Sequence, residues 1–188
     1  MSDNSALLRN GNKILIEKQP YIILETEFVN PGKGQAFTRI KVRNLLSNKV
    51  LEKTIKIGEN LDEADVINTK MQFLYKESNT YFFMNIESYE QVEVKSDILN
   101  ENAIWLVDGD ECNVTTWNGS IIQVEPPKFV NLLVKSTVEA IKGDTVSSTL
   151  KEAVLDNGQK IMVPIFIKEG ERIKIDTENN EYSARVKA

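Results

Sequence analysis

Hydrophobic and polar residues alternate along most of the chain with a period of two, which is the pattern of β-strands with one buried face. In the segment Ala36–Leu45, for example, Ile40 and Val42 alternate with cationic residues. Only Ser96–Asn102 has the pattern of a short helix. The sequence therefore predicts an all-β fold.

The expected strands are short, rich in β-branched and aromatic residues, and separated by polar turns. Those before residue 126 are Pro20–Val29, Ala36–Leu45, Val50–Ile57, Val66–Tyr75, Tyr81–Asn85, Gln91–Val94, Ile104–Val107, Cys112–Trp117 and Ile121–Val124. Those after it are Phe129–Thr137, Thr149–Leu155, Lys160–Ile167, Arg172–Asp176 and Tyr182–Val186. A tight hairpin turn is expected at Asn118-Gly119.

Pro126-Pro127 marks a domain boundary, because proline cannot occupy the middle of a sheet. The strands after it fill residues 129–188, which suits a small Greek-key barrel of the oligonucleotide-binding (OB) kind. The middle segment has a similar number of strands. We therefore expect three small domains, residues 1–65, 66–128 and 129–188. Three such domains in a row would span roughly 75 Å, the length of a folded tRNA rather than that of a compact enzyme.

Charge is distributed unevenly among these segments, although the net charge is only −5. Residues 1–60 carry 10 basic and 6 acidic side chains, residues 61–128 carry 4 and 13, and residues 129–188 carry 9 and 9. The N-terminal surplus includes Lys33, Arg39, Lys41 and Arg43, which predicts a surface for a polyanion there. The alternative is that these alternating cations simply form the solvated face of a strand.

The absence of histidine excludes Ser/His/Asp and Cys/His nucleophilic sites and histidine-ligated zinc. Cys112 is the only cysteine, so the chain has neither an internal disulfide nor a multi-cysteine metal site. Residues 1–12 lack the apolar stretch of a signal peptide, and no run approaches the roughly 18–20 apolar residues that span a bilayer. We therefore expect a cytoplasmic protein that does not bind a membrane.

Three further features are expected to be structural rather than functional. The acidic sequence Asp108–Glu111 lacks the spacing of a calcium loop and predicts a solvated turn. Trp105 and Trp117 are expected in the core of the middle barrel, and Cys112 is expected to be a small buried residue. No metal site is predicted.

Lys33 is the sharpest candidate for a functional residue. It lies between Gly32 and Gly34 in the turn Asn30–Gly34, which joins two expected strands. Small neighbours leave the lysine side chain free to project from a hairpin tip. The Walker A spacing is absent, and a hairpin tip offers no apolar pocket for a Schiff-base lysine. A solvated turn lysine is the alternative.

The residues around Lys33 resemble the N-terminal domain of bacterial elongation factor P, and matching segments continue along the chain. The segments that carry this resemblance are Glu27–Phe37, Arg39–Leu45, Phe73–Tyr75, Phe83–Asn85, Tyr89–Gln91, Lys142–Thr145, Val163–Phe166, Gly170, Ile175–Thr177 and Glu181–Val186. Asn180 stands where the family often has glycine, and asparagine also tolerates a left-handed turn.

The resemblance implies an N-terminal SH3-like (KOW-type) barrel followed by two OB-fold barrels, arranged as an elongated, tRNA-like L. It also implies a monomeric translation elongation factor that contacts both ribosomal subunits between the peptidyl and exit sites. Such a factor stimulates peptide-bond formation and relieves stalling at consecutive prolines. It is not an enzyme, because the ribosome remains the catalyst.

The same resemblance implies the roles of individual residues. Lys33 would carry a covalent β-lysyl group, added by a ligase resembling lysyl-tRNA synthetase, and no other cofactor is expected. A lysine at the tip excludes the glycosylated arginine of another branch of the family, whereas the differently modified lysine of a further branch stays an alternative. The residues expected to face the peptidyl-site tRNA are Gly32, Lys33, Gly34, Arg39, Lys41, Arg43, Tyr182 and Arg185. The loop Gly143, Asp144, Thr145 would approach messenger RNA in the exit site.

Alternatives remain for these assignments. The turn at residues 143–145 could be an ordinary turn, Tyr182 could pack at a strand end, and Arg185 could be a solvated side chain. The chain could also be a paralogue of elongation factor P with an unmodified tip. An enzyme with paired carboxylates is disfavoured, because no base with a near-neutral pKa and no partnered nucleophile are present.

Overall fold

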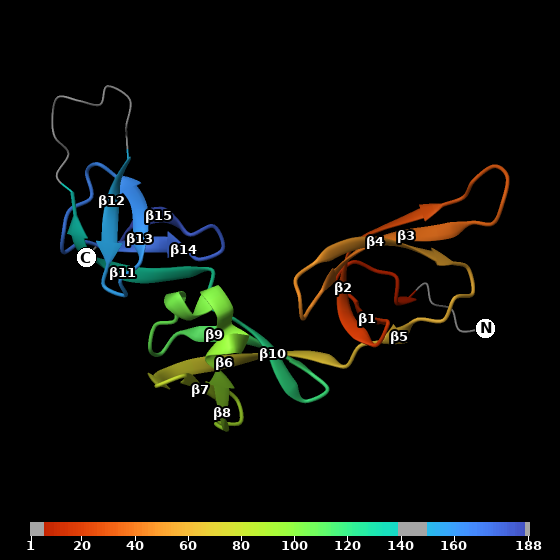
Figure 1. The fold of residues 1–188 in the computed structure, drawn as a ribbon, viewed down its shortest axis with the longest axis horizontal. Coiled ribbons are helices and arrows are strands. Elements are labelled where there is room, and N and C mark those ends of the chain that lie inside the picture. Colours follow the sequence, from red (N-terminus) through yellow and green to blue (C-terminus); the bar gives the residue numbers. More distant parts are fainter. Residues whose placement is uncertain (1–5, 139–149, 187–188) are drawn as a thin grey trace. The chain divides into compact units, whose positions relative to one another are not determined.

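The computed structural model describes residues 6–138 and 150–186, most of which lie in β-strands (Figure 1). The strands form three five-stranded sheets, each built from strands that are consecutive in the sequence. The predicted all-β fold is confirmed. None of the helices in the described part of the chain is long and apolar enough to cross a membrane.

The first sheet has the strand order β4-β3-β2-β1-β5. Its strands are β1 (Lys13–Ile16), β2 (Gln19–Val29), β3 (Phe37–Asn44), β4 (Val50–Lys56) and β5 (Asp62–Glu63). Alternate residues of these strands point inward, which gives a core that includes Ile14, Ile23, Ile40, Val42 and Ile55. The antiparallel hairpin of β2 and β3 stays in register as far as Val29 and Phe37, so it holds the intervening loop at its end.

The second sheet has the order β10-β9-β6-β7-β8. Its strands are β6 (Val66–Glu77), β7 (Thr80–Asn85), β8 (Gln91–Lys95), β9 (Glu111–Trp117) and β10 (Ser120–Glu125). The short helix α1 (Ser96–Leu99) and the 3-10 helix η2 (Asn100–Trp105) follow β8. The Phe73 ring packs against Phe83, with centroids 5.3 Å apart, and against Tyr81, at 6.0 Å.

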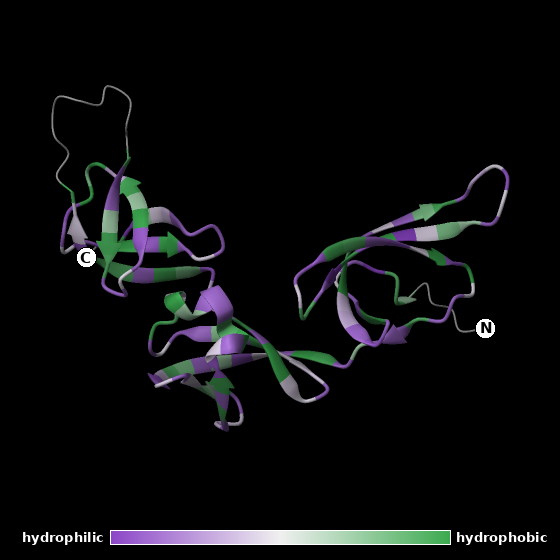
Figure 2. Cartoon of the chain, in the orientation of Figure 1, coloured by the Kyte–Doolittle hydropathy of each residue, from purple (hydrophilic) through white to green (hydrophobic). Residues whose placement is uncertain are grey.

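The third sheet has the order β13-β12-β11-β14-β15. Its strands are β11 (Phe129–Thr137), β12 (Leu150–Leu155), β13 (Lys160–Pro164), β14 (Arg172–Asp176) and β15 (Glu181–Arg185). Figure 2 shows hydrophobic and hydrophilic residues alternating along these strands. By compactness the chain divides into two units, Met1–Thr69 with Val114–Val124 and Lys70–Asn113 with Glu125–Ala188. The domain boundaries after residues 65 and 128 stay predictions.

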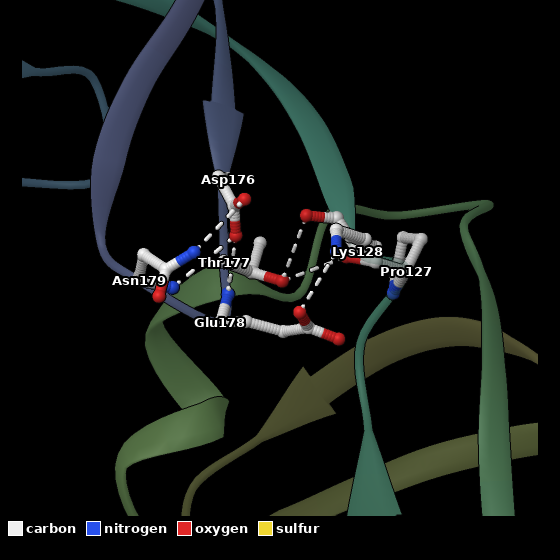
Figure 3. Close-up of polar contacts among 6 residues, drawn as sticks. All are labelled: Pro127, Lys128, Asp176, Thr177, Glu178 and Asn179. Carbon is white, nitrogen blue, oxygen red and sulfur yellow. Dashed lines mark hydrogen bonds and ion pairs between the residues drawn. The ribbon is translucent and has the colours of Figure 1, made fainter.

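Polar contacts attach the segment just before β11 to the turn after β14 (Figure 3). The Thr177 hydroxyl lies 2.9 Å from the carbonyl oxygen of Pro127 and 3.1 Å from that of Lys128, and the Thr177 backbone N–H donates to Lys128. The Lys128 ammonium pairs with Glu178 at 3.0 Å. Hydrogen bonding and attraction to Glu178 raise the pKa of Lys128. These contacts therefore fix Pro127 and Lys128, which directly precede β11, to the third sheet.

Trp105 corrects two predictions from the sequence. The strand expected at Ile104–Val107 is wrong, because Trp105 ends the helix η2 instead. The indole is 2% exposed and belongs to the core of the third sheet, not to that of the middle barrel. Its Nε1–H donates to Asn180 Oδ1 at 2.8 Å, and Asn157 Nδ2 donates to the Ile104 carbonyl at 2.7 Å. The apolar residues at 104–107 therefore do not pair as a strand. Trp105 packs instead against residues that follow much later in the sequence.

Other differences are smaller. β1 and β5 were not expected, because each is too short to show a strand pattern on its own. The predicted helix Ser96–Asn102 divides into α1 and η2, and Trp117 is half-buried rather than a core residue. The left-handed conformation expected at Asn180 is confirmed, with φ of 56°.

The Cys112 thiol is buried as predicted, and its burial is testable. Burial, together with the nearby carboxylates Asp110 and Glu111, raises the pKa of this thiol to about 12. We expect Ellman's reagent to leave the native thiol unmodified at pH 8 and to titrate one thiol per chain in denaturant. Because the folded state keeps the proton, stability should also fall as pH rises above the thiol's ordinary pKa. Rapid labelling of the native protein would contradict this burial.

Candidate nucleic-acid interface

Figure 1 shows the loop that joins β2 to β3 at the end of their hairpin. Lys33 is exposed in the middle of this loop. Gly34 has a φ of 112°, which side-chain-bearing residues rarely adopt, so the loop needs glycine at this position. A Cβ at Gly32 would meet no atom within 4 Å, so this glycine leaves open space beside the lysine. None of the ion pairs found among the described residues involves Lys33. The local sequence thus presents one unpaired cation at the end of a hairpin.

The cations of β3 lie on the outer face of the first sheet, but two of them are paired. Arg39 Nη1 lies 3.1 Å from Glu27 Oε2, and Lys41 Nζ lies 3.1 Å from Glu25 Oε1. Both pairs are cross-strand neighbours in the register of β2 and β3. The residues lining an open groove on this face are Glu25, Thr26, Glu27, Arg39, Lys41 and Glu52. The basic surplus of the N-terminal segment is therefore partly neutralised here.

Sequence reasoning missed these carboxylates as part of the site. The sequence does allow these pairings to be predicted, because the residues that face each other across a hairpin can be found by counting outward from its turn. A bulge between Ile23 and Glu25 shifts that register by one residue, so the count works only for the part of the hairpin near the loop.

Arg43 is half-buried and lies further along β3, beside the same face. Its Nε atom is buried without a hydrogen-bond partner in the described part of the chain. Arg39, Lys41 and Arg43 alternate with the buried residues Ile40 and Val42, as the strand pattern predicts. The structure thus brings the three cations to one face.

Tyr182 and Arg185 both lie on β15, in the other compact unit. A spacing of three would place them on opposite faces of a regular strand. A bulge changes this, because Tyr182 pairs with Ile175 whereas Arg185 pairs with Ile173, so both face the same way. Tyr182 is half-buried against the third core, and Arg185 lies 3.4 Å from Glu171 Oε1.

Gly143, Asp144 and Thr145 lie outside the described residues. Asp108 and Gly109 form a turn, and Glu111 already begins β9. The Gly109 N–H donates to the Phe73 carbonyl, and the Gly109 carbonyl accepts from Gln72 Nε2 at 3.0 Å. The described residues contain no group of three or more carboxylate or cysteine side chains placed to hold a metal ion.

Comparison with known proteins gives matches to elongation factor P in all three parts of the chain. Residues 4–61 match the elongation factor P KOW-like domain, residues 66–124 match its OB domain, and residues 130–185 match its C-terminal domain. A relative, Elongation factor P 2 of Protochlamydia amoebophila (strain UWE25), is 45% identical over 180 residues, which covers 95% of each chain. The expected N-terminal KOW-like domain and middle OB domain are thereby confirmed.

Two solved structures are also similar in part. Eukaryotic translation initiation factor 5A from Methanococcus jannaschii has a TM-score of 0.49 and 22% identity, covering 62% of this chain and 88% of that one. An eIF-5A family protein from Naegleria fowleri has a TM-score of 0.49 and 19% identity, covering 63% and 92%. The sequence matches over all three domains are the stronger finding, and they show that this chain belongs to the elongation factor P family of translation factors.

Proposed function

We propose that this protein binds the ribosome between the peptidyl and exit sites and stimulates peptide-bond formation where consecutive prolines stall synthesis. Its family supports this proposal. The observation that carries it is the exposed, unpaired Lys33 on a glycine-flanked loop at the end of the β2–β3 hairpin. In this proposal Lys33 reaches the acceptor end of the peptidyl-site tRNA, in the cytoplasm.

The physical basis is positioning rather than chemistry. Proline is a constrained donor and acceptor of peptides, so holding the tRNA end in a reactive geometry lowers the entropic part of the barrier. An ammonium group can donate to phosphate and ribose oxygens without losing a proton in the reaction. Lys33 therefore needs exposure and reach, and the ribosome remains the catalyst.

We propose further that Lys33 carries a β-lysyl group. A ligase must reach the lysine amine, and the open surroundings of Gly32 and Lys33 suit such access. The extension would lengthen the reach of the side chain and add hydrogen-bond donors. Arg39, Lys41 and Arg43 would support the tRNA from β3, and Tyr182 and Arg185 would contact RNA from β15.

The test is tripeptide formation on a Pro-Pro-Pro template in a reconstituted translation system, with protein from its own source. Mass spectrometry of the Lys33 peptide gives the modification state of the same sample. We expect strong acceleration on this template and little on Phe-Phe-Phe. Failure with a mass-shifted Lys33 would contradict the proposed function. Full acceleration with an unmodified Lys33 would favour the paralogue with an unmodified tip.

The ion pairs on the first sheet lead to a separate prediction. Changing Glu25→Gln and Glu27→Gln together removes the carboxylates that compete with phosphates for Lys41 and Arg39. We expect several-fold tighter tRNA binding at low salt and a steeper salt dependence. Stability should change by less than about 1 kcal/mol per pair, because both pairs are exposed. Filter binding of purified tRNA at several KCl concentrations measures the effect.

The matched control is Glu152→Gln, which breaks the exposed Lys160–Glu152 pair in the third sheet. This variant should bind tRNA as the unchanged protein does. If the double variant and the control behave alike, the outer face of β3 does not contact RNA.

A further inference from the structure

The turn between β7 and β8, residues Asn85–Glu90, has a well-defined set of hydrogen bonds. Asn85 Oδ1 accepts from the backbone N–H groups of Glu87 at 2.8 Å and Ser88 at 3.1 Å. The Tyr89 N–H donates to the Asn85 carbonyl, and the Asn85 N–H donates to the Glu90 carbonyl, both at 2.9 Å. Tyr89 has a φ of 60°, in the left-handed region.

The same turn occurs in each of the other two sheets. In the first sheet, Asn44 Oδ1 accepts from the N–H groups of Leu46 and Ser47, and Asn48 has a φ of 58°. In the third sheet, Asp176 Oδ1 accepts from Glu178 and Asn179 (Figure 3), and Asn180 has a φ of 56°. The chain therefore contains three versions of one turn, which can be compared position by position.

The fifth position of the turn separates them. Asn48 and Asn180 suit a left-handed backbone, because asparagine tolerates this conformation better than other side-chain-bearing residues. Tyr89 does not, and it is the only aromatic residue with positive φ in the described chain. A tyrosine at this position therefore contradicts the local preference that the two sister turns follow, and such conflicts concentrate at functional sites.

Packing does not explain the tyrosine. Its side chain is 72% exposed, which makes it the most exposed of the large hydrophobic residues among those described. Ile86, in the same turn, is 38% exposed. An aromatic and an aliphatic side chain presented together to solvent are typical of an interaction surface.

The charge around the turn indicates the kind of partner. Residues 80–94 contain three glutamates, Glu87, Glu90 and Glu93, and no lysine or arginine. All three are exposed, and none takes part in the ion pairs found in the described ranges. The surrounding segment, residues 61–128, carries 13 acidic and 4 basic side chains. This surface repels phosphates and attracts cations.

We propose that the Asn85–Glu90 turn is a docking surface for an arginine-containing segment of a basic protein. A guanidinium stacks on the exposed face of the Tyr89 ring and pairs with Glu87 or Glu90, while Ile86 contacts the apolar part of the arginine side chain. Lysine is a poorer fit, because its ammonium does not stack on a ring in this way. This surface goes beyond the proposed function, which concerns RNA contacts of other residues.

The test uses the full-length protein, labelled with ¹⁵N, and three probes: a short arginine-glycine peptide, the matching lysine-glycine peptide and a single-stranded oligouridine. We expect the arginine peptide to shift the amide signals of residues 85–90 and to bind at least threefold more tightly than the lysine peptide. The sister turn at residues 44–49, which has neither an aromatic nor an acidic residue, serves as the internal control. Oligouridine should leave residues 85–90 unshifted.

The variant Tyr89→Asn restores the residue of the sister turns and separates binding from structure. We expect its thermal midpoint to rise by about 2–4 °C, because backbone strain is relieved. Its affinity for the arginine peptide should fall at least fivefold. A lowered midpoint would show that the tyrosine is structural, and would overturn the proposal. So would unchanged peptide binding, shifts of residues 85–90 with oligouridine alone, or equal shifts at both turns. None of these measurements depends on translation activity.

Discussion

Changing Trp105→Ala is expected to lower the free energy of unfolding of the third barrel by about 3–5 kcal/mol. The indole is 2% exposed and is packed among the buried residues of β11–β14. Its removal loses the transfer free energy of a large aromatic group and leaves a cavity that surrounding strands can only partly fill. It also leaves Asn180 Oδ1 without the indole N–H as its donor.

Denaturant titration followed by circular dichroism, with hydrogen exchange of amides in β11 and β14, measures this effect. Trp105→Phe is the informative second variant, because it keeps an aromatic ring and removes only part of the volume and the hydrogen bond. We expect it to cost less than the alanine variant. Trp117→Ala is the matched control, since Trp117 is only half-buried. If both tryptophan-to-alanine changes cost the same, Trp105 does not have the special place in the third core that we assign to it.

Changing Lys33→Ala is expected to abolish the acceleration of Pro-Pro-Pro synthesis while leaving the fold intact. The side chain is exposed in a turn and has no ion pair within the described chain, so the unfolding free energy should change by less than about 0.5 kcal/mol. Lys33→Arg should also fail, because it keeps the charge but removes the amine to which a β-lysyl group would be attached.

Lys49→Ala is the control for this experiment, because Lys49 is another exposed turn lysine of the first sheet. Its loss should leave the rate on Pro-Pro-Pro unchanged. Thermal denaturation of all three variants tests the structural part of the prediction. A Lys33→Ala protein that loses stability together with activity would mean that the lysine supports the loop rather than the tRNA.

Much of the fold could be predicted because the strands obey the simplest pattern. In β3, Ile40 and Val42 are buried while Arg39 faces outward, as period-two alternation requires. The two-residue strand β5 could not be predicted, because two residues carry no period. The region Ile104–Val107 was mistaken for a strand because an apolar run has the same composition whether it pairs with a neighbouring strand or packs into the core of a later domain.

In the candidate site too, some features could be predicted from the sequence and others could not. The exposure of Lys33 followed from its glycine neighbours, since local backbone freedom is a property of the residues themselves. The partners of Arg39 and Lys41 depended on strand register, which is set by the whole hairpin and its bulge. Tyr182 and Arg185 share a face only because a bulge adds one residue between them, and no composition signal marks that residue in advance.

The position of Trp105 has a consequence for how this chain can be divided. Its ring completes the core of a barrel whose strands all follow residue 128, so that core draws on a residue supplied from outside the barrel's own segment. A fragment starting at Phe129 would contain every strand of the barrel and still lack one of its core side chains. During synthesis the tryptophan leaves the ribosome before the strands that enclose it. The core of the third barrel therefore contains a side chain from a segment that is synthesised before any of the barrel's own strands.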